Sequence, residues 1–273
     1  MLGLNWRYLA FDVHPDDLRA AIAGAKAMGF IGLNLTVPHK VLAVEIVDVI
    51  DEQAKYFGAV NTIRFEGRAK SGEWLPLAQL AEDEASEFRS HGFNTDSEGF
   101  TMSLREEFPK LNLKGASAVL IGTGGAGRTV ALRLAQEGVQ TLNLIDVDAS
   151  RAEQVAREIL AGFPSTRVNL GYPGKGGSAD LLVNATPLGL KPTDPLPLDE
   201  ARFPAGKARF VYDLVYRPAE TPLLAGAKAA GCHTANGLGM LLYQGTKALE
   251  IWTGQPAPVA IMRHTLEQNV YGH

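Results

Sequence analysis

The sequence contains little of what marks secreted, membrane-spanning or nucleic-acid-binding proteins. It has one cysteine, Cys232, so an internal disulfide is impossible and the chain suits a reducing compartment. No apolar run is long enough to cross a bilayer, and the first residues lack the basic and apolar regions of a signal peptide. The net charge is only -4, which offers no basic surface to nucleic acid or anionic lipid. We therefore expect a cytoplasmic protein without nucleic-acid or membrane partners.

Metal sites and reactive thiols are also not indicated. The 6 histidines are scattered without the spacing of metal ligands, so we expect no metal. Cys232 has no activating neighbour in the sequence and is typical of a small buried apolar residue. With 273 residues, the chain can form two modest domains or one large one.

The most informative stretch is 117–146. An apolar run predicts a buried strand, and Gly122, Gly124 and Gly127 follow it with the spacing G-x-G-x-x-G. A helical pattern comes next, and then a second apolar strand that ends at Asp146. The strand, the helix and the terminal acid supply the context that this glycine motif needs to indicate dinucleotide binding. A glycine-rich turn in another kind of α/β protein is the alternative.

Each part of this stretch has a physical role. Gly122 permits a tight turn, Gly124 lets the backbone approach a pyrophosphate, and Gly127 lets the helix pack on the strand. The free N–H groups at the helix N-terminus then bind phosphate, and Asp146 can accept hydrogen bonds from ribose hydroxyls. The candidate cofactor-binding residues of this stretch are Gly122, Gly124, Gly125, Ala126, Gly127, Asp146 and Arg151.

Strand and helix patterns alternate along most of the chain, which predicts an α/β fold. We expect two domains, an α/β substrate domain and a doubly wound Rossmann nucleotide-binding domain. The substrate domain covers 1–97 with C-terminal helices from 240–273, and the nucleotide domain covers 98–239. In the first domain we expect strands at 4–13, 32–37 and 59–65, and helices from His14 to Ala27 and from Val41 to Ile50.

Residues 67–92 interrupt the alternation. We expect an acidic helix from Ala78 to Arg89 within this segment. A solvated excursion between two strands is the favoured interpretation, because surface insertions cost little. A lid or a partner contact is the alternative.

Several short segments together resemble the shikimate dehydrogenases and the related quinate/shikimate dehydrogenases. The resemblance covers nearly the whole chain in order, and it implies an oxidoreductase of aromatic amino acid biosynthesis through chorismate. It also implies an active site in the cleft between the domains, and a homodimer is possible. The matching segments are 34–40, 58–62, 94–96, 122–127, 184–189, 212–216 and 237–244.

The resemblance assigns roles to individual residues. Lys40 and Asp96 form the catalytic pair, in which a lysine trades a proton with the substrate hydroxyl while the carboxylate positions it. Alone, Lys40 would be interpreted as a surface lysine and Asp96 as a helix N-cap. The substrate-binding candidates are Asn34, Thr36, Asn61, Tyr216 and Gln244, and those beside the nicotinamide are Thr186, Leu214, Gly237 and Met240.

The beginning of the sequence departs from the family. Members usually start with a strand and a Ser-x-Ser segment that binds the substrate carboxylate. Residues 2–8 resemble the stretch after that segment, and the strand and serine pair are not found. A start placed too late, altered substrate binding and another chain filling the gap are all open explanations. Without the two hydroxyl donors, we expect weak binding of shikimate or quinate.

The cofactor motif departs as well. Many shikimate dehydrogenases carry Asn-Arg-Thr after the second strand of the nucleotide domain, to grip a 2′-phosphate. The matching residues are Asp146, Val147 and Asp148, and Arg151 is the remaining cation. Two carboxylates would repel a phosphate, whereas Asp146 can bind ribose hydroxyls. We therefore expect NAD as cofactor, with NADP less favoured, as in quinate/shikimate dehydrogenases.

Two other functions stay open. One is a nucleotide-binding homologue that has lost catalysis, which the missing serine segment suggests. The presence of Lys40, Asp96, Asn61 and Gln244 together argues against it. The other is a folate-linked dehydrogenase of similar architecture, and residues 94–96 with Asn61 argue against that assignment.

Overall fold

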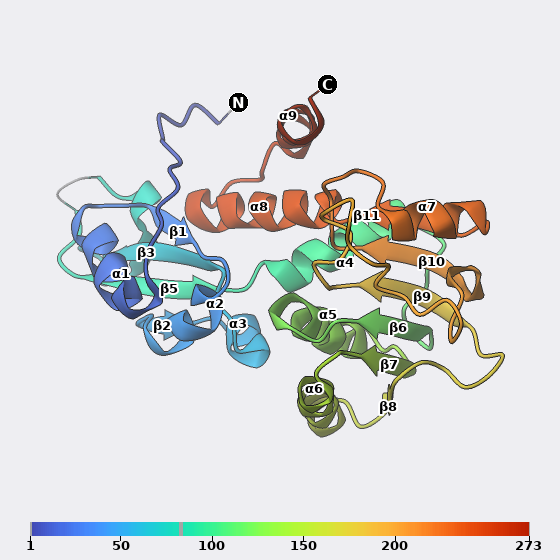
Figure 1. Cartoon of the computed structure of the whole chain (residues 1–273). Helices are drawn as coiled ribbons and strands as arrows, with labels where there is room; N and C mark the ends of the chain where they lie inside the picture. Colours follow the sequence, from blue (N-terminus) through green and yellow to red (C-terminus); the bar gives the residue numbers. More distant parts are fainter. Residues whose placement is uncertain (1, 82–83, 273) are drawn as a thin grey trace. The chain divides into compact units, whose positions relative to one another are not determined.

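The computed structural model describes residues 2–81 and 84–272 (Figure 1). The chain divides into two compact units. The first comprises Met1–Glu98 with Gln244–His264, and the second comprises Gly99–Tyr243 with Thr265–His273. The division near the C-terminus therefore falls at Gln244 rather than 240, and the last residues belong to the second unit.

The first unit contains a mixed five-stranded sheet. Its strand order is β1-β3-β5-β2, and β4 pairs with β3 outside that path. Strand β3 is antiparallel to β1, β4 and β5, whereas β2 runs parallel to β5. The strands are β1 (Gly32–Asn34), β2 (Val49–Ile50), β3 (Thr62–Arg68), β4 (Trp74–Pro76) and β5 (Phe88–Phe93).

Short helices complete the first unit. Leu18 and Ile22 of α1 are buried in one cluster with Ile63 and Phe65 of β3, so this helix covers one face of the sheet. The carboxylate of Asp51 accepts hydrogen bonds from the backbone N–H groups of the first turn of α3, a regular N-cap. The helical segments are η1 (Pro15–Asp17), α1 (Leu18–Ala27), α2 (His39–Leu42), η2 (Ala43–Glu45), α3 (Glu52–Phe57) and η3 (Leu77–Gln79).

The prediction of a strand at residues 4–13 is wrong. Residues 2–13 run as irregular chain, and the side chains of Leu9 and Phe11 are 66% and 62% exposed. A strand needs a neighbour for its backbone groups, and no described residue pairs with this segment in a ladder. Strand β1 is also shorter than the expected 32–37, because a turn with a hydrogen bond from His39 N to Thr36 O follows it.

The predictions of two helices are wrong as well. Residues 41–50 form the end of α2, the 3₁₀ turn η2 and then strand β2. In the acidic segment 78–89, the described residues form the end of η3, irregular chain and, from Phe88, the start of β5. Glu82 and Asp83 lie outside the described residues. The pairing of β5 with β3 over six residue pairs explains why the strand prevails over the local helical pattern.

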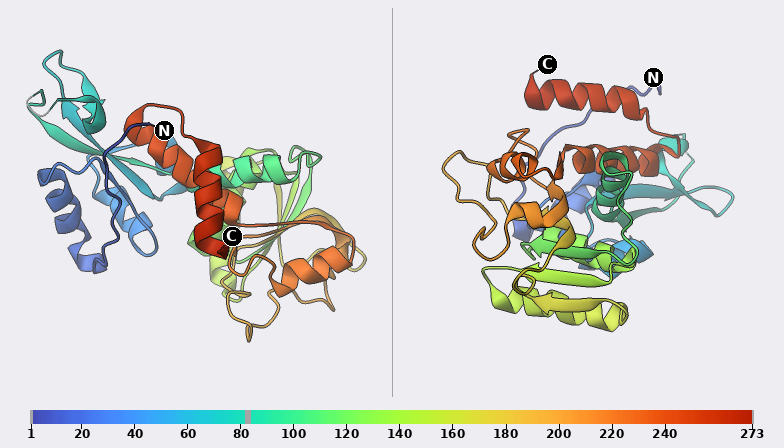
Figure 2. Two further views of the ribbon diagram at one scale, coloured as in Figure 1. Left: turned by 90° about the horizontal axis from the view of Figure 1, so that it is seen from above. Right: turned by 90° about the vertical axis from the view of Figure 1, so that its right-hand side faces the viewer.

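The second unit has a six-stranded parallel sheet in the order β11-β10-β9-β6-β7-β8, the order of a Rossmann fold. Its strands are labelled in Figure 1 and drawn in green to orange in Figure 2. The buried side chains of Val211 and Leu182 pack with helix α7 (Pro222–Ala229) on one face. On the other face, the ring of Tyr212 contacts Phe100 and Phe108, in and just after α4. Helices thus cover both faces, and the expected doubly wound α/β fold is confirmed.

The elements of this unit follow the expected alternation. The strands are β6 (Ser117–Ile121), β7 (Thr141–Ile145), β8 (Arg167–Leu170), β9 (Ala179–Asn184), β10 (Ala208–Asp213) and β11 (His233–Asn236). The helices are α4 (Asp96–Glu107), α5 (Gly125–Gln136), α6 (Ala149–Gly162), η4 (Ala205–Lys207), α7 (Pro222–Ala229), α8 (Leu238–Thr253) and α9 (Val259–Tyr271). Helices α4, α8 and α9 extend across a division between the units.

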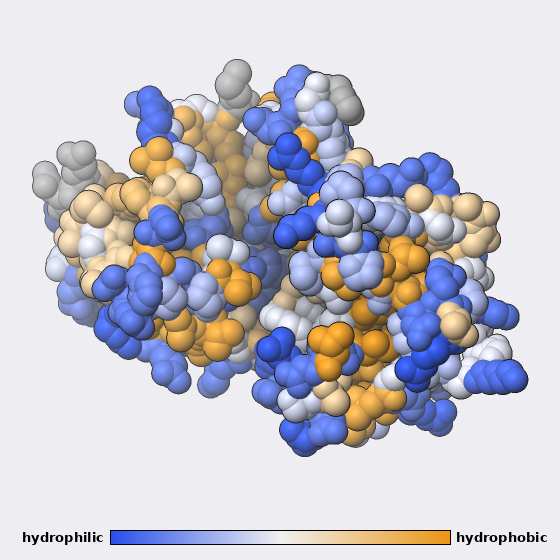
Figure 3. Space-filling model, viewed as in Figure 1, coloured by the Kyte–Doolittle hydropathy of each residue, from blue (hydrophilic) through white to orange (hydrophobic). Residues whose placement is uncertain are grey.

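The surface carries both hydrophilic and apolar side chains. On the face drawn in Figure 3, hydrophilic side chains surround smaller apolar areas. Among the described helices, none has the length and apolar character needed to span a membrane.

Candidate functional site

The predicted catalytic pair forms a direct ion pair in the first unit. The Nζ atom of Lys40, on α2, lies 2.8 Å from Oδ2 of Asp96, the first residue of α4. The Asn61 amide donates a hydrogen bond to the other carboxylate oxygen at 3.0 Å. Both charged side chains are mostly buried, with exposed fractions of 25% and 14%. The structure therefore brings Lys40, Asp96 and Asn61 together, as the sequence predicts.

Backbone hydrogen bonds hold this group in place. The N–H of Asn61 donates to the carbonyl of Phe93, and its own carbonyl accepts from Leu35. The N–H of Val60 donates to the carbonyl of Lys40 at 2.8 Å. Three segments distant in sequence are thus fixed beside one another, so the ion pair rests on sheet-supported backbone rather than on a free loop.

The N-terminus of α4 is capped by Asn94 rather than by Asp96. Oδ1 of Asn94 accepts from the backbone N–H groups of Asp96 and Ser97 at 3.1 and 3.3 Å. Because Asn94 does the capping, the Asp96 carboxylate can face Lys40 and Asn61.

Tyr8 is a member of this group that the sequence did not indicate. Its hydroxyl donates to Oδ1 of Asn34 at 2.9 Å. The Asn34 amide donates to Oγ1 of Thr62, which donates to Oδ1 of Asn61. Hydrogen bonds therefore connect Tyr8 to Lys40 without a break. The one sequence signal for Tyr8 was its position in a stretch that we expected to form a strand.

The remaining substrate candidates lie in separate segments of the chain. Thr36 is exposed in the turn before α2, and its carbonyl accepts from His39. Gln244 is half-buried on α8 in the first unit. Tyr216 belongs to the second unit, where its carbonyl accepts a hydrogen bond from the Tyr271 hydroxyl at 2.9 Å. The roles of these residues stay predictions.

The glycine-rich loop of the second unit has the geometry of a dinucleotide site. Gly122 has φ +90°, which L side chains rarely adopt. A Cβ atom on Gly127 would lie 1.9 Å from the Gly122 carbonyl oxygen, so only glycine allows this contact between helix and strand. A Cβ on Gly124 would meet no atom within 4 Å. Gly124 therefore leaves open space before the N-terminus of α5, where Gly125 and Ala126 lie, and helix N-termini of this kind bind phosphate groups.

The acids after β7 are engaged with local partners. Oδ2 of Asp146 accepts from the backbone N–H and the hydroxyl of Thr123, at 2.6 and 2.8 Å. Burial alone would raise the pKa of Asp146, but these bonds and one from the Asp148 N–H outweigh it and lower the pKa. Asp148 in turn caps α6 through Ser150 and pairs with Arg151 at 3.1 Å.

Beside the predicted nicotinamide residues, a buried network ties two loops together. Oδ1 of Asp213 accepts from the Asn184 amide at 2.9 Å, and its other oxygen accepts from the Thr221 hydroxyl at 2.6 Å. Burial raises the pKa of Asp213, although the hydrogen bonds oppose that effect. Asn184 also accepts from the backbone N–H and hydroxyl of Thr186. Asn184 and Asp213 thus position Thr186.

Leu214, Gly237 and Met240 follow the ends of β10 and β11. A Cβ on Gly237 would lie 2.1 Å from the Leu214 carbonyl oxygen, so the two backbones are in close contact. Met240 lies in the first turn of α8, and its backbone hydrogen-bonds to the buried Tyr212 hydroxyl. Among the described residues, no cluster of three or more histidines, cysteines and acids could hold a metal ion.

Comparison with known proteins identifies relatives along the whole chain. A shikimate dehydrogenase (NADP(+)) of Methanopyrus kandleri is 39% identical over 274 residues, covering 98% of this chain and 87% of that protein. One of Moorella thermoacetica is 42% identical, covering 97% and 84%. The crystal structure of a shikimate dehydrogenase in complex with NADP+ matches with a TM-score of 0.81 and 34% identity, over 98% of this chain and 86% of that one.

These names contradict the expectation of NAD, which was wrong. It treated Asp146 and Asp148 as bare charges facing the ribose. In the structure, the Asp146 carboxylate faces Thr123, while Asp148 is paired with Ser150 and Arg151. Both carboxylates stay ionised, because their hydrogen bonds lower their pKa values, so their charges alone did not predict the cofactor named for the relatives.

The family models agree with the relatives. The shikimate dehydrogenase substrate binding domain matches residues 1–63, and the shikimate 5′-dehydrogenase C-terminal domain matches residues 237–267. The chain belongs to the shikimate dehydrogenase family, a family of oxidoreductases.

Proposed function

We propose that this protein oxidises a ring hydroxyl of shikimate to the ketone, and catalyses the reverse reduction, with NADP(H) as cofactor. The observation that supports this most is the Lys40–Asp96 ion pair, surrounded by neutral hydrogen-bonding side chains. The same chain carries a glycine-rich loop that fits a dinucleotide. The names of the relatives supply the substrate and the cofactor.

Lys40 is the acid/base group of the proposal. The bound cofactor supplies a carbon that accepts or returns the hydride. In the oxidation direction, Nζ of Lys40 takes the hydroxyl proton as the C–O bond becomes a carbonyl, and in reduction it returns that proton. Asp96 holds Nζ at 2.8 Å and stabilises the ammonium form that results.

The substrate is read by neutral groups. Asn34, Asn61 and Tyr8 present amides and a hydroxyl within one hydrogen-bonded group, which suits a polyhydroxylated ring. Thr36, Tyr216 and Gln244 complete the proposed set. Quinate carries similar hydroxyls, so it is the alternative substrate, and the kinetics must distinguish it from shikimate.

Arg151 is the proposed contact for the 2′-phosphate of NADP. It lies in the first turn of α6, which follows β7 and Asp146. Its side chain is 63% exposed and pairs only at the surface with Asp148, so a phosphate can compete for it. A guanidinium matches phosphate geometry well.

The test is steady-state kinetics of the intact chain with shikimate and quinate, each with NADP+ and NAD+. The highest kcat/KM is expected for shikimate with NADP+. Arg151→Ala should lower kcat/KM with NADP+ by about tenfold, with little change for NAD+, which corresponds to about 1.4 kcal/mol. Arg157→Ala is the matched control, since this arginine lies on the same helix and pairs with Glu153 at the surface.

Other outcomes are decisive. A higher kcat/KM for quinate would replace the proposed substrate. A preference for NAD+ would contradict the proposed cofactor. No turnover with any pair, together with NADP+ binding by calorimetry, would show a nucleotide-binding homologue that has lost catalysis.

A further inference from the structure

The last turn of α9 is bound to the segment that carries Tyr216. The Tyr271 hydroxyl donates to the Tyr216 carbonyl and accepts from the Asn236 amide, at 2.9 Å in each case. Burial raises the pKa of Tyr271, although the hydrogen bond from Asn236 opposes that effect. One hydroxyl therefore links two parts of the second unit that are distant in sequence.

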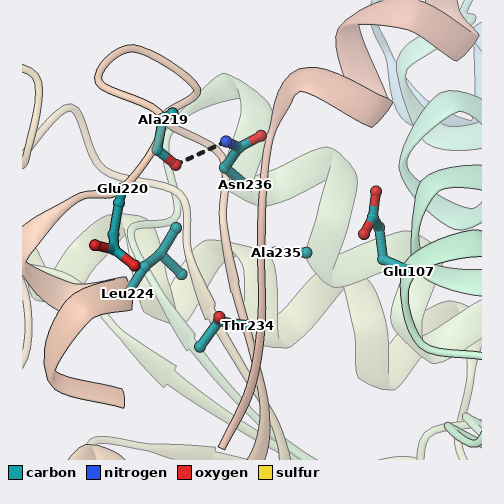
Figure 4. Close-up of a pocket in the computed structure, with 7 residues that line it drawn as sticks. All are labelled: Glu107, Ala219, Glu220, Leu224, Thr234, Ala235 and Asn236. Carbon is teal, nitrogen blue, oxygen red and sulfur yellow. Dashed lines mark hydrogen bonds between the residues drawn. The ribbon is translucent and has the colours of Figure 1, made fainter. Parts of the chain in front are cut away.

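The Asn236 side chain makes two further hydrogen bonds. Asn236 ends β11, and Oδ1 accepts from the backbone N–H of Leu238 at 3.0 Å, which caps α8. Its amide also donates to the Ala219 carbonyl at 2.8 Å, the bond drawn in Figure 4. Asn236 thus connects the start of α8 to the segment that follows Tyr216. The Tyr271 hydroxyl is hydrogen-bonded to both Asn236 and Tyr216.

Packing contributes little to that segment. Residues 217–220 are all exposed. Ala219 and Glu220 line one pocket, shown in Figure 4, and also a second one that Tyr271 borders. Because the segment is exposed and borders two pockets, its position depends on its hydrogen bonds. Tyr271 and Asn236 provide two of them.

The same segment adjoins the predicted nicotinamide-side wall. Tyr216 is two residues from Leu214, whose carbonyl oxygen is in close contact with Gly237. Asp213 and Asn236 are paired in the parallel ladder of β10 and β11. A shift of Tyr216 or Asn236 would therefore reach Leu214 and Gly237.

We propose that Tyr271 is a positioning residue, which sets the place of Tyr216 through its hydroxyl and so tunes the affinity for the substrate. The inference rests on the proposed function, in which Tyr216 contacts shikimate. It assigns to the C-terminal helix α9 a part in substrate binding.

Tyr271→Phe tests this with the intact chain, because it removes only the hydroxyl. The KM for shikimate should rise about 2- to 10-fold, the usual value of one hydrogen bond, with kcat changed less than twofold. Tyr172→Phe is the matched control. It also removes a hydroxyl from the second unit, one that accepts from the Asp199 N–H at 3.0 Å, and its KM should not change.

A double-mutant cycle with Tyr216→Phe separates positioning from stability. If Tyr271 acts through Tyr216, adding Tyr271→Phe to Tyr216→Phe should raise KM no further. Equal increases in both backgrounds would overturn the proposal. An unchanged KM in active Tyr271→Phe would also overturn it, even with a lowered Tm, because a purely structural role predicts that result.

Hydrogen exchange gives a readout that does not need activity. Tyr271→Phe should speed the exchange of amides in residues 214–220, while those of β6 and β7 keep the wild-type rate. If the wild-type chain fails to oxidise shikimate, the proposed function fails, and this measurement alone decides about Tyr271. Faster exchange would then support the positioning role of Tyr271, and unchanged exchange would overturn it.

Discussion

Replacing Glu66 by Gln should weaken the first unit more than any surface substitution. Glu66 is 1% exposed on β3 and binds Arg64, Arg89 and His91. Burial alone would raise its pKa, but the hydrogen bonds from these side chains outweigh it and lower the pKa from 4.5 to about 2. At 1.36 kcal/mol per pKa unit, this shift corresponds to about 3 kcal/mol of stability at pH 7.

The sign of the pH dependence follows from the lowered pKa. The contribution of Glu66 is fully present above pH 4.5, its value in the unfolded chain, and is lost as pH falls towards about 2. The difference in unfolding free energy between wild type and Glu66→Gln should therefore fall from about 3 kcal/mol at pH 7 to about 2 kcal/mol at pH 3.5.

The assay is urea unfolding followed by tryptophan fluorescence. All 3 tryptophans, Trp6, Trp74 and Trp252, belong to the first unit, so the signal reports that unit alone. Glu87→Gln is the matched control, because Glu87 makes an exposed ion pair with Arg68 on the same sheet and should cost less than about 1 kcal/mol. Equal effects of the two substitutions, or a difference that grows in acid, would refute the reasoning.

Two further predictions concern the predicted substrate and cofactor sites. Tyr8→Phe removes the donor to Asn34 and should raise the KM for shikimate about 2- to 10-fold, whereas Tyr56→Phe in the same unit should not; initial rates at varied shikimate decide it. Gly127→Ala places a Cβ atom 1.9 Å from the Gly122 carbonyl and should abolish measurable NADP+ binding by calorimetry. Gly226→Ala, in a helix where a Cβ meets nothing within 4 Å, should leave binding unchanged and raise stability by about 0.5–1 kcal/mol. Retained NADP+ binding in Gly127→Ala would contradict the description of the loop.

The second unit was predictable because its signals are local. Gly122 and Gly127 have one physical explanation each, and the buried strands of a parallel sheet are continuous apolar runs. The first unit was less predictable because its elements depend on distant partners. Strand β5 forms by pairing with β3, and residues 4–13 have the alternation of a strand but no partner in the described residues.

The candidate site shows the same contrast. The resemblance to a family predicted roles for Lys40, Asp96 and Asn61, and the structure places these three side chains in contact. Tyr8 and Tyr271 were not predicted, because the role proposed for each depends on a hydrogen bond to a residue far away in sequence. The charges of Asp146 and Asp148 misled the cofactor prediction, since a sequence does not show that a carboxylate already has partners.

The most direct test of the proposed reaction is the rate of Lys40→Ala with shikimate and NADP+. We expect kcat to fall by about 10²–10⁴-fold, the usual contribution of an acid/base group, while the Kd for NADP+ stays within about twofold. Lys26→Ala is the matched control, because Lys26 also pairs with an aspartate in the first unit, at 3.2 Å, and should keep wild-type kinetics. A kcat near wild type in Lys40→Ala would contradict the proposed mechanism.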